Sequence, residues 1–255
     1  MARKRKLSTL KTVAVTILAL CLMSVAVYYL IKFFTKAAHV KYPAFGINIP
    51  LGYAIHGIDV SRYQRVIDWS DVKNMQVKDI KIGFAFIKAT EGIGKIDAQF
   101  RRNWLKAADE KIPKGAYHYF IAGESGKAQA QNFIDIVKLE KGDLPPVLDV
   151  EQSNRTGIDD LRKEVLVWLN KIEQEYKTKP VIYTNIYFYN RYLSTGFDDY
   201  PFWIAHYLQP AKPRLSRNWL FWQHSESGHV NGIGPPVDFN VFAGDSLEFD
   251  NLLLK

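Results

Sequence analysis

The pattern of apolar and polar positions divides the chain into three stretches. Residues 12–31 are 20 consecutive uncharged, mostly apolar residues between Lys11 and Lys32. Residues 32–53 show no clear period and contain the turn formers Pro43, Gly46, Pro50 and Gly52, as a linker does. From residue 54 onward, β-prone apolar runs alternate with helical patterns. We therefore expect an N-terminal apolar segment, a linker and one folded domain over residues 54–255.

Eight short apolar runs predict the strands of this domain, and five amphipathic patterns predict its helices. The strands are Ile55–Val60, Ile82–Ala89, Gly115–Phe120, Pro146–Val150, Val181–Thr184, Phe202–Ala205, Leu220–Gln223 and Val237–Asn240. The helices are Trp69–Met75, Ala98–Lys111, Gly126–Lys138, Ile158–Tyr176 and Tyr187–Leu193. Alternating strands and helices predict a parallel sheet, and eight strands favour closure. With only about five helices, and loops joining the last three strands, the predicted fold is an irregular TIM-like α/β barrel.

The apolar run at residues 12–31 predicts a single transmembrane helix that precedes the barrel. At 1.5 Å per residue it would span about 30 Å, the thickness of a bilayer core. The basic residues in positions 1–11 are expected to form a cytoplasmic tail, which places the barrel on the periplasmic or extracellular side. The alternative is a cleaved signal peptide ending near Ser24-Val25-Ala26. Both interpretations predict an exported domain, and an uncleaved anchor would tether it near the cell wall.

The charge distribution argues against a nucleic-acid partner. The formal net charge is +8, but residues 1–36 contain seven basic residues and no acidic one. Removing these seven from the 34 basic residues leaves 27 basic against 26 acidic residues, a balance of +1. The single cysteine, Cys21, lies in the apolar run and excludes both an intrachain disulfide and a thiolate zinc site. The histidine spacing does not suggest zinc, and no phosphate-binding glycine loop is present, so we expect no metal and no cofactor.

Polar side chains collect at the carboxyl ends of the predicted strands. In an α/β barrel those ends form one rim, where the active sites of such enzymes lie. Any single member could simply cap a loop, but acids at several successive strand ends favour a site. The residues at these ends are Asp59, Glu91, His118, Tyr119, Asp149, Glu151, Asn185, His206, Gln223 and Asp238.

The sharpest local feature is the segment Pro146–Glu151, in which an acid alternates with an apolar residue. Side chains two apart on a strand point the same way, so Asp149 and Glu151 would face one pocket. Neighbouring carboxylates raise the pKa of one another, which supplies a proton donor near neutral pH. Cleavage of a glycosidic bond requires such an acid. An Asp-x-Glu triplet is also common on solvated strand edges, so the motif alone does not decide the function.

Aromatic residues at the same strand ends favour a sugar substrate, because pyranose rings have apolar faces and polar edges. At least half of these aromatics are expected to belong to the barrel core instead. The candidates are Tyr117, Tyr119, Tyr183, Trp203, Tyr207 and Trp222. Lys88 is flanked by apolar strand residues and is expected to be a paired interior lysine, while His118, His206 and His224 are expected to be structural or to contact substrate.

Taken together, these segments resemble the glycoside hydrolase family 25 lysozymes. The resemblance rests on His56–Ser61 with Tyr63 and Gln64, Phe86–Gly92, Gly115–Phe120, Leu148–Glu151, Tyr183–Asn185, Phe202–Tyr207, Phe221–His224 and Val237–Asn240. It covers nearly everything after residue 53, in the family's order. It implies an irregular barrel of eight strands and five helices, and hydrolysis of the β-1,4 bond between N-acetylmuramic acid and N-acetylglucosamine in peptidoglycan.

The resemblance also implies roles for individual residues. Glu151 would be the general acid/base, Asp149 would orient the 2-acetamido group of the substrate, and Asp59 and Asp238 would complete the acidic floor. The residues expected to bind sugar are Tyr63, Glu91, Tyr119, Tyr183, Trp203, Tyr207 and Gln223. Direct attack by water with inversion stays open beside the substrate-assisted route. Two other functions also stay open: a catalytically silent wall-binding scaffold, and a glycosidase for other acetamido sugars. We expect a monomer.

Overall fold

The computed structural model describes residues 2–34 and 39–255, which fall into two compact units divided after Ala38. In the first unit, Ala2–Phe34 form one helix, α1. Residues 2–11 of the predicted tail and the apolar run therefore belong to the same helix. Among the described residues, no helix is both long enough and apolar enough to cross a membrane. The transmembrane span predicted over residues 12–31 is thus not confirmed.

The second unit is built on a closed barrel of eight strands, as the sequence predicts. In chain order these are β3 (His56–Val60), β5 (Ile80–Glu91), β7 (Lys114–Tyr119), β8 (Val147–Asp149), β9 (Val181–Asn185), β10 (Phe202–Ala205), β11 (Phe221–Gly228) and β12 (Val237–Phe242). Neighbours from β3 to β11 run parallel, and β12 runs antiparallel to both β11 and β3. The additional pairing of β3 with β5 closes the barrel. The antiparallel β12 is the main irregularity.

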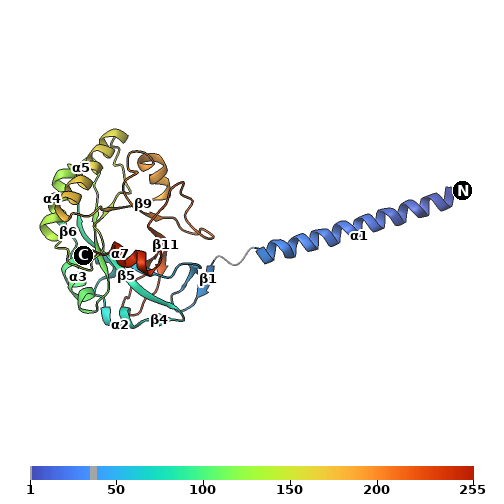
Figure 1. Ribbon diagram of the computed structural model, residues 1–255, viewed down its shortest axis with the longest axis horizontal. Helices are drawn as coiled ribbons and strands as arrows, with labels where there is room; N and C mark the ends of the chain where they lie inside the picture. Colours follow the sequence, from blue (N-terminus) through green and yellow to red (C-terminus); the bar gives the residue numbers. More distant parts are fainter. Residues whose placement is uncertain (1, 35–38) are drawn as a thin grey trace. The chain divides into compact units, whose positions relative to one another are not determined.

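The described residues contain seven α-helices, of which six belong to the barrel unit. Four match the sequence prediction in place: α2 (Trp69–Asn74), α3 (Phe100–Asp109), α4 (Gly126–Ile136) and α5 (Ile158–Tyr176). The predicted helix at 187–193 is a short α6 (Ile186–Phe188) continued by a π-helical turn, η2 (Tyr189–Leu193). Figure 1 shows α3, α4 and α5 along one side of the barrel. The helix that the sequence prediction missed is α7 (Ser246–Leu252), which Asp245 and Glu248 begin with a reciprocal capping box.

A short hairpin before the barrel corrects the predicted linker. Residues 32–53 were expected to be a tether, yet β1 (His39–Tyr42) and β2 (Ile47–Pro50) pair antiparallel within the barrel unit. Their side chains Tyr42, Ile47 and Ile49 are buried in the main core. The hairpin therefore belongs to the folded unit, whose described part begins at His39. Two further short strands, β4 (Gln76–Val77) and β6 (Lys95–Ile96), flank β5.

The lower barrel interior is filled by a cluster of aromatic rings. Phe86 stacks on Trp203 at 4.6 Å between ring centroids and meets Phe221 edge-on at 5.1 Å. Phe249 of α7 packs against this cluster through Phe84 at 5.7 Å. Gly57 of β3 leaves room for Phe84, because a Cβ at that position would lie 2.5 Å from the ring. The aromatic layer is the solid floor beneath the polar upper half of the barrel.

Candidate active site

A cleft of about 460 Å³ opens at the carboxyl ends of the parallel barrel strands and at the amino end of the antiparallel β12. Every residue that the sequence analysis assigned to catalysis or proposed as a sugar contact lines this cleft except Glu91 and Trp222. The lining also contains residues that the sequence prediction did not assign to the site: Val60, Ser61, Gln64, Lys88, Glu226 and Pro236. Alternation along the strands explains this convergence, because every second side chain faces the barrel axis.

Asp149 and Glu151 form the first of two carboxyl pairs in the cleft; we call them the Asp149 pair. Asp149 ends β8, pairs across the sheet with Tyr119 and Tyr183, and is only 6% exposed. Burial, followed by the charge of Glu151, raises the pKa of Asp149 well above its ordinary value. Burial also raises the pKa of Glu151, which lies beside Asp149 and Asn185. The charge of each carboxyl group therefore bears on the proton affinity of the other, and the two titrate as a pair.

One oxygen of Asp149 stands out within this pair. Asp149 Oδ1 is buried and has no hydrogen-bond partner in the part of the chain that the structure describes. A buried acceptor without a partner costs about 1–3 kcal/mol relative to a bonded one. An acceptor left in this state at a cleft is suited to a donor on a ligand.

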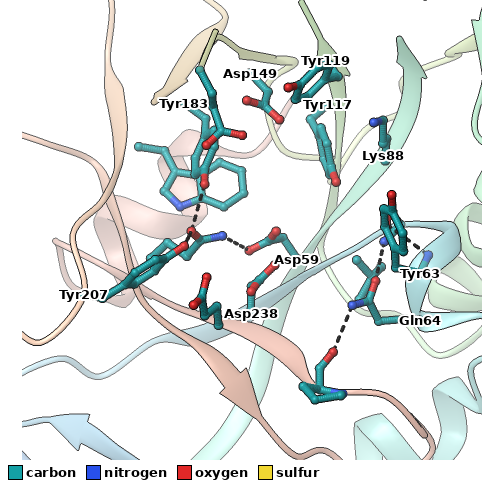
Figure 2. A pocket seen from close by; sticks show the side chains of 17 residues that line it. Asp59, Tyr63, Gln64, Lys88, Tyr117, Tyr119, Asp149, Tyr183, Tyr207 and Asp238 are labelled. Atoms are coloured by element: carbon teal, nitrogen blue, oxygen red, sulfur yellow. Dashed lines mark hydrogen bonds between the residues drawn. The ribbon is translucent and has the colours of Figure 1, made fainter. Parts of the chain in front are cut away.

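Asp59 and Asp238 form the second pair, the Asp59 pair. They are direct neighbours across β3 and β12, and Figure 2 shows both inside the cleft. Asp59 accepts hydrogen bonds from Gln223 Nε2 at 2.9 Å and from Asn240 Nδ2 at 2.7 Å. Burial and then the charge of Asp59 raise the pKa of Asp238 to about 9. At neutral pH, Asp238 is therefore protonated and bonds to Asp59.

Gln223 connects this second pair to the aromatic wall. Its Oε1 accepts hydrogen bonds from the hydroxyls of Tyr183 at 2.9 Å and Tyr207 at 2.7 Å. Asn240 fixes the floor in the same way, because its Oδ1 accepts from Trp203 Nε1 at 2.7 Å. The sequence analysis did not assign a role to Asn240. The signal was available, since Asn240 lies two residues after Asp238 on one strand and faces the same side.

Lys88 is the positively charged side chain in the cleft lining, and it forms an ion pair with Glu91, which lies outside the lining. Lys88 Nζ lies 2.7 Å from Glu91 Oε2 and 4.5 Å from the centroid of the Tyr119 ring. Lys95 holds the other Glu91 oxygen at 2.7 Å. Glu91 is thus occupied by two lysines, and the structure does not support its predicted contact with sugar. The expectation that Lys88 is a paired interior lysine is confirmed.

The remaining strand-end candidates lie outside the cleft. His118 bonds to Thr90 at 2.7 Å and to Gln129 at 3.2 Å, and it stacks on Trp168 behind the barrel wall. Trp222 also points away from the cleft lining, with its Nε1 donating to the carbonyl of His206. His118 is therefore structural, which is one of the two roles that the sequence analysis predicted for it.

Comparison with known proteins identifies the family of this barrel. The sequence profile of glycosyl hydrolases family 25 matches residues 58–233. The chain belongs to this family. Family 25 membership and lysozyme relatives together make the protein a glycoside hydrolase. The match contains six of the eight barrel strands in full and the cleft residues from Asp59 to Glu226.

Individual family 25 relatives cover most of the chain. The uncharacterized protein YegX of Escherichia coli is 46% identical over 201 residues, which are 79% of this chain and 74% of YegX. Lysozyme M1 of Streptomyces globisporus is 34% identical over 209 residues, with 75% and 69% of the two chains covered. The structure of a family 25 glycosyl hydrolase from Bacillus anthracis superposes with a TM-score of 0.72 at 37% identity, covering 78% of this chain and 93% of that one.

Proposed function

We propose that this chain is a muramidase, which hydrolyses the β-1,4 bond between N-acetylmuramic acid and N-acetylglucosamine in peptidoglycan. The observation that carries the proposal is the Asp149 pair: two neighbouring carboxyl groups with raised pKa values in a cleft of a family 25 barrel. The similarity to lysozyme M1 supports the substrate class. Glycosidic cleavage requires a proton donor beside a group that stabilises positive charge at the sugar, and this pair combines the two.

Glu151 is the proposed general acid. It is only partly buried, whereas Asp149 lies deeper, so Glu151 is the member of the pair that reaches bound substrate. Its raised pKa keeps a proton available in the range where an unperturbed glutamate would be ionised. The proton passes to the bridging glycosidic oxygen as the bond from that oxygen to the anomeric carbon breaks. The ionised Glu151 then accepts a proton from the incoming water.

Asp149 is proposed to act on the substrate's 2-acetamido group. In this proposal its unpartnered Oδ1 accepts the acetamido N–H, and its charge stabilises the cationic oxazoline ring that forms when the acetamido oxygen attacks the anomeric carbon. Water opens that ring and the product keeps the β configuration. Direct attack by water instead gives the α product. Proton NMR of the first-formed product distinguishes the routes, and an α product would contradict the substrate-assisted one.

The rest of the cleft is proposed to bind and orient the glycan. The Asp59 pair, fixed by Gln223 and Asn240, holds the polar floor without taking part in proton transfer to the leaving group. The ring of Tyr63 is 70% exposed at the cleft and offers an apolar face to a sugar. The other proposed sugar contacts are Tyr119, Tyr183, Trp203, Tyr207 and Gln223.

We also propose that the barrel lies outside the cytoplasmic membrane, because its proposed substrate lies there. We propose that it acts there as a monomer. The basic residues of positions 1–11 and the apolar run at 12–31 support export. Protease added to a suspension of intact spheroplasts should degrade the barrel, whether the barrel is attached to the spheroplasts or released into the medium. A barrel that is degraded only after lysis would contradict this placement.

The substrate assignment is tested by product analysis. The full chain is incubated with purified peptidoglycan beside its Glu151→Gln variant, and the products are reduced with borohydride. Reduced muramic acid from the wild type and none from the variant is the expected result. Reduced glucosamine would assign glucosaminidase chemistry instead. Absence of any release by a folded protein would favour the silent wall-binding scaffold.

A further inference from the structure

A second cavity, of about 430 Å³, lies against the wall of the active-site cleft. The hairpin of β1 and β2 borders it through His39 and Asn48. On β11, Glu226 lines the cleft while its neighbours Ser225 and Ser227 line this cavity. The segment after β10 repeats the arrangement, because Tyr207 lines the cleft and Gln209 lines the cavity. The two spaces therefore share a wall that is one chain segment thick.

Two polar side chains in this cavity lack the hydrogen bonds that buried groups normally make. His224 is only 7% exposed, and neither of its ring nitrogens has a partner among the described residues. The Oε1 atom of Gln209 is also buried without a hydrogen-bond partner among the described residues. The Nε2 atom of Gln209 donates to the carbonyl of Tyr207 at 3.1 Å. Buried polar groups are bonded in the large majority of cases. Two exceptions around one cavity point to a ligand that completes them.

The lining defines the chemistry of such a ligand. It contains no aspartate, glutamate, lysine or arginine among the described residues. Burial lowers the pKa of His224 to about 3 and also lowers the pKa of His39, so both rings are neutral at neutral pH. A neutral imidazole offers one donor and one acceptor, and the Gln209 oxygen adds an acceptor. The ligand is therefore uncharged and carries both donors and acceptors.

The mouth of the cavity adds an apolar contact. Leu208 is 96% exposed and has a backbone φ of 57°, a left-handed conformation that leucine rarely adopts. It stands between Tyr207 in the cleft and Gln209 in the cavity. Strained residues of this kind concentrate at binding sites. An apolar side chain beside unpaired polar groups matches a sugar, which has an apolar face and a polar edge.

We propose that this cavity is a second saccharide site, which binds an uncharged acetamido sugar of the glycan strand next to the active-site cleft. The proposal rests on the proposed function, because the strand cleaved in the cleft supplies the sugar. N-acetylglucosamine fits the uncharged lining. The lactyl group of N-acetylmuramic acid carries either the bulky stem peptide or a free carboxylate, which would enter the cavity without a cation to pair with. The site would keep the enzyme on the strand between cleavage events.

Calorimetric titration of the full chain with N,N′,N″-triacetylchitotriose tests the proposal. The Glu151→Gln background prevents turnover. We expect two binding events per chain, one in the cleft and one in the cavity. Asn48→Trp places a bulky ring on an exposed position of the cavity wall and should abolish one event or weaken it by about tenfold or more. Leu51→Trp, on an exposed residue of the same region that does not line the cavity, should leave both events intact.

The His224→Phe variant provides a second measurement, because it keeps a planar ring and removes both nitrogens. It should weaken the same event as Asn48→Trp while leaving the other unchanged. Binding in the parent chain that neither Asn48→Trp nor a folded His224→Phe alters, whether as one event or two, would overturn the proposal, as would the absence of any binding. If the cavity event is present but the wild-type chain releases no muramic acid ends, the muramidase assignment fails and the saccharide site stands.

Discussion

The two carboxyl pairs in the cleft have similar composition but different surroundings. In the Asp59 pair, amide groups of Gln223 and Asn240 donate to Asp59, and Asp238 supplies a further bond. In the Asp149 pair, Asp149 Oδ1 lacks a partner among the described residues, and Glu151 is partly exposed. Burial raises pKa values in both pairs, so the pKa direction does not distinguish them. The difference in hydrogen bonding does.

This comparison indicates a division of labour between the pairs. A carboxylate whose acceptors are already bonded contributes to structure and to the local field, because a ligand would have to displace those bonds. A carboxyl pair with an unpartnered acceptor and raised pKa values is suited to bind a donor and to transfer a proton. We therefore propose that the Asp149 pair carries out the chemistry and that the Asp59 pair supports the floor of the cleft.

The largest expected effect comes from Glu151→Gln. The amide keeps the size of the side chain but cannot give up a proton to the leaving oxygen, so kcat should fall by about 10³-fold or more. Turbidity clearing and product analysis on purified peptidoglycan measure it. Glu226→Gln is the matched control, since Glu226 lines the same cleft outside both pairs and should cost about tenfold or less. Equal losses in the two variants would contradict the assigned acid.

Asp149→Asn should have the next largest effect, a fall in kcat of about 100-fold. The asparagine oxygen can still accept the acetamido N–H, but the negative charge that stabilises the cationic ring is lost. Peptidoglycan whose muramic acid residues lack the N-acetyl group sharpens the measurement. On that substrate the wild type should be slow, and Asp149→Asn should cost little more. A full additional loss would place Asp149 outside the acetamido step.

Asp238→Asn should change kcat near neutral pH by only about fivefold or less, because the amide can replace the hydrogen bond that protonated Asp238 makes. Its effect should appear in stability. The pKa of Asp238 is raised to about 9 from 3.8, so the folded chain keeps a proton that the unfolded chain releases between those values. The free energy of unfolding should therefore fall as pH rises toward 9, by up to about 1.4 kcal/mol per unit.

Urea unfolding at pH 5, 7 and 9 compares the two chains. The wild type should lose stability over this range, and Asp238→Asn should show a flatter dependence. If the free energy of unfolding changed with pH to the same extent in both chains, the Asp59 pair would not hold the buried proton that we expect on Asp238.

Lys88→Met should give the smallest effect, a change in rate at the optimum of about threefold or less. The positive charge of Lys88 opposes the effect of burial on the pKa of Asp149 and of Glu151. Removing it raises both pKa values, so the acid stays protonated to higher pH. The alkaline limb of the kcat–pH profile should therefore shift to higher pH. The control is Lys95→Met, which removes only the outer partner of Glu91 and should leave the alkaline limb at the same pH. A shift of the alkaline limb to lower pH would contradict the predicted direction of the pKa change.

The sequence predicted the barrel well because its strands are short apolar runs between clear helical patterns. The whole of α5 was predicted to the residue, since Leu161, Val165 and Trp168 mark one buried face. The hairpin of β1 and β2 was missed because Pro43 and Gly46 indicated a linker, although Tyr42, Ile47 and Ile49 are apolar at positions that the core buries. The seven-residue α7 shows too little periodicity to detect, and only its capping box marked it.

The location of the site followed from strand ends, but its hydrogen bonds and ion pairs did not. Asp59 and Asp238 are far apart in the chain, and only the closure of the barrel through β12 makes them neighbours. The two lysine partners of Glu91, which lies outside the cleft lining, depend on the turn into β6, which the sequence pattern did not reveal. The unpartnered oxygen of Asp149 is likewise a property of packing that sequence spacing cannot express.

The most direct test of the account measures Glu151→Gln and Asp238→Asn side by side for the release of reducing muramic acid from purified peptidoglycan at neutral pH. Each variant replaces one carboxyl group by an amide, and each residue belongs to one of the two pairs. We predict that Glu151→Gln loses at least about 10³-fold in rate while Asp238→Asn keeps about a fifth or more. Losses of the same size, or a larger loss in Asp238→Asn, would contradict the assignment of the chemistry to the Asp149 pair.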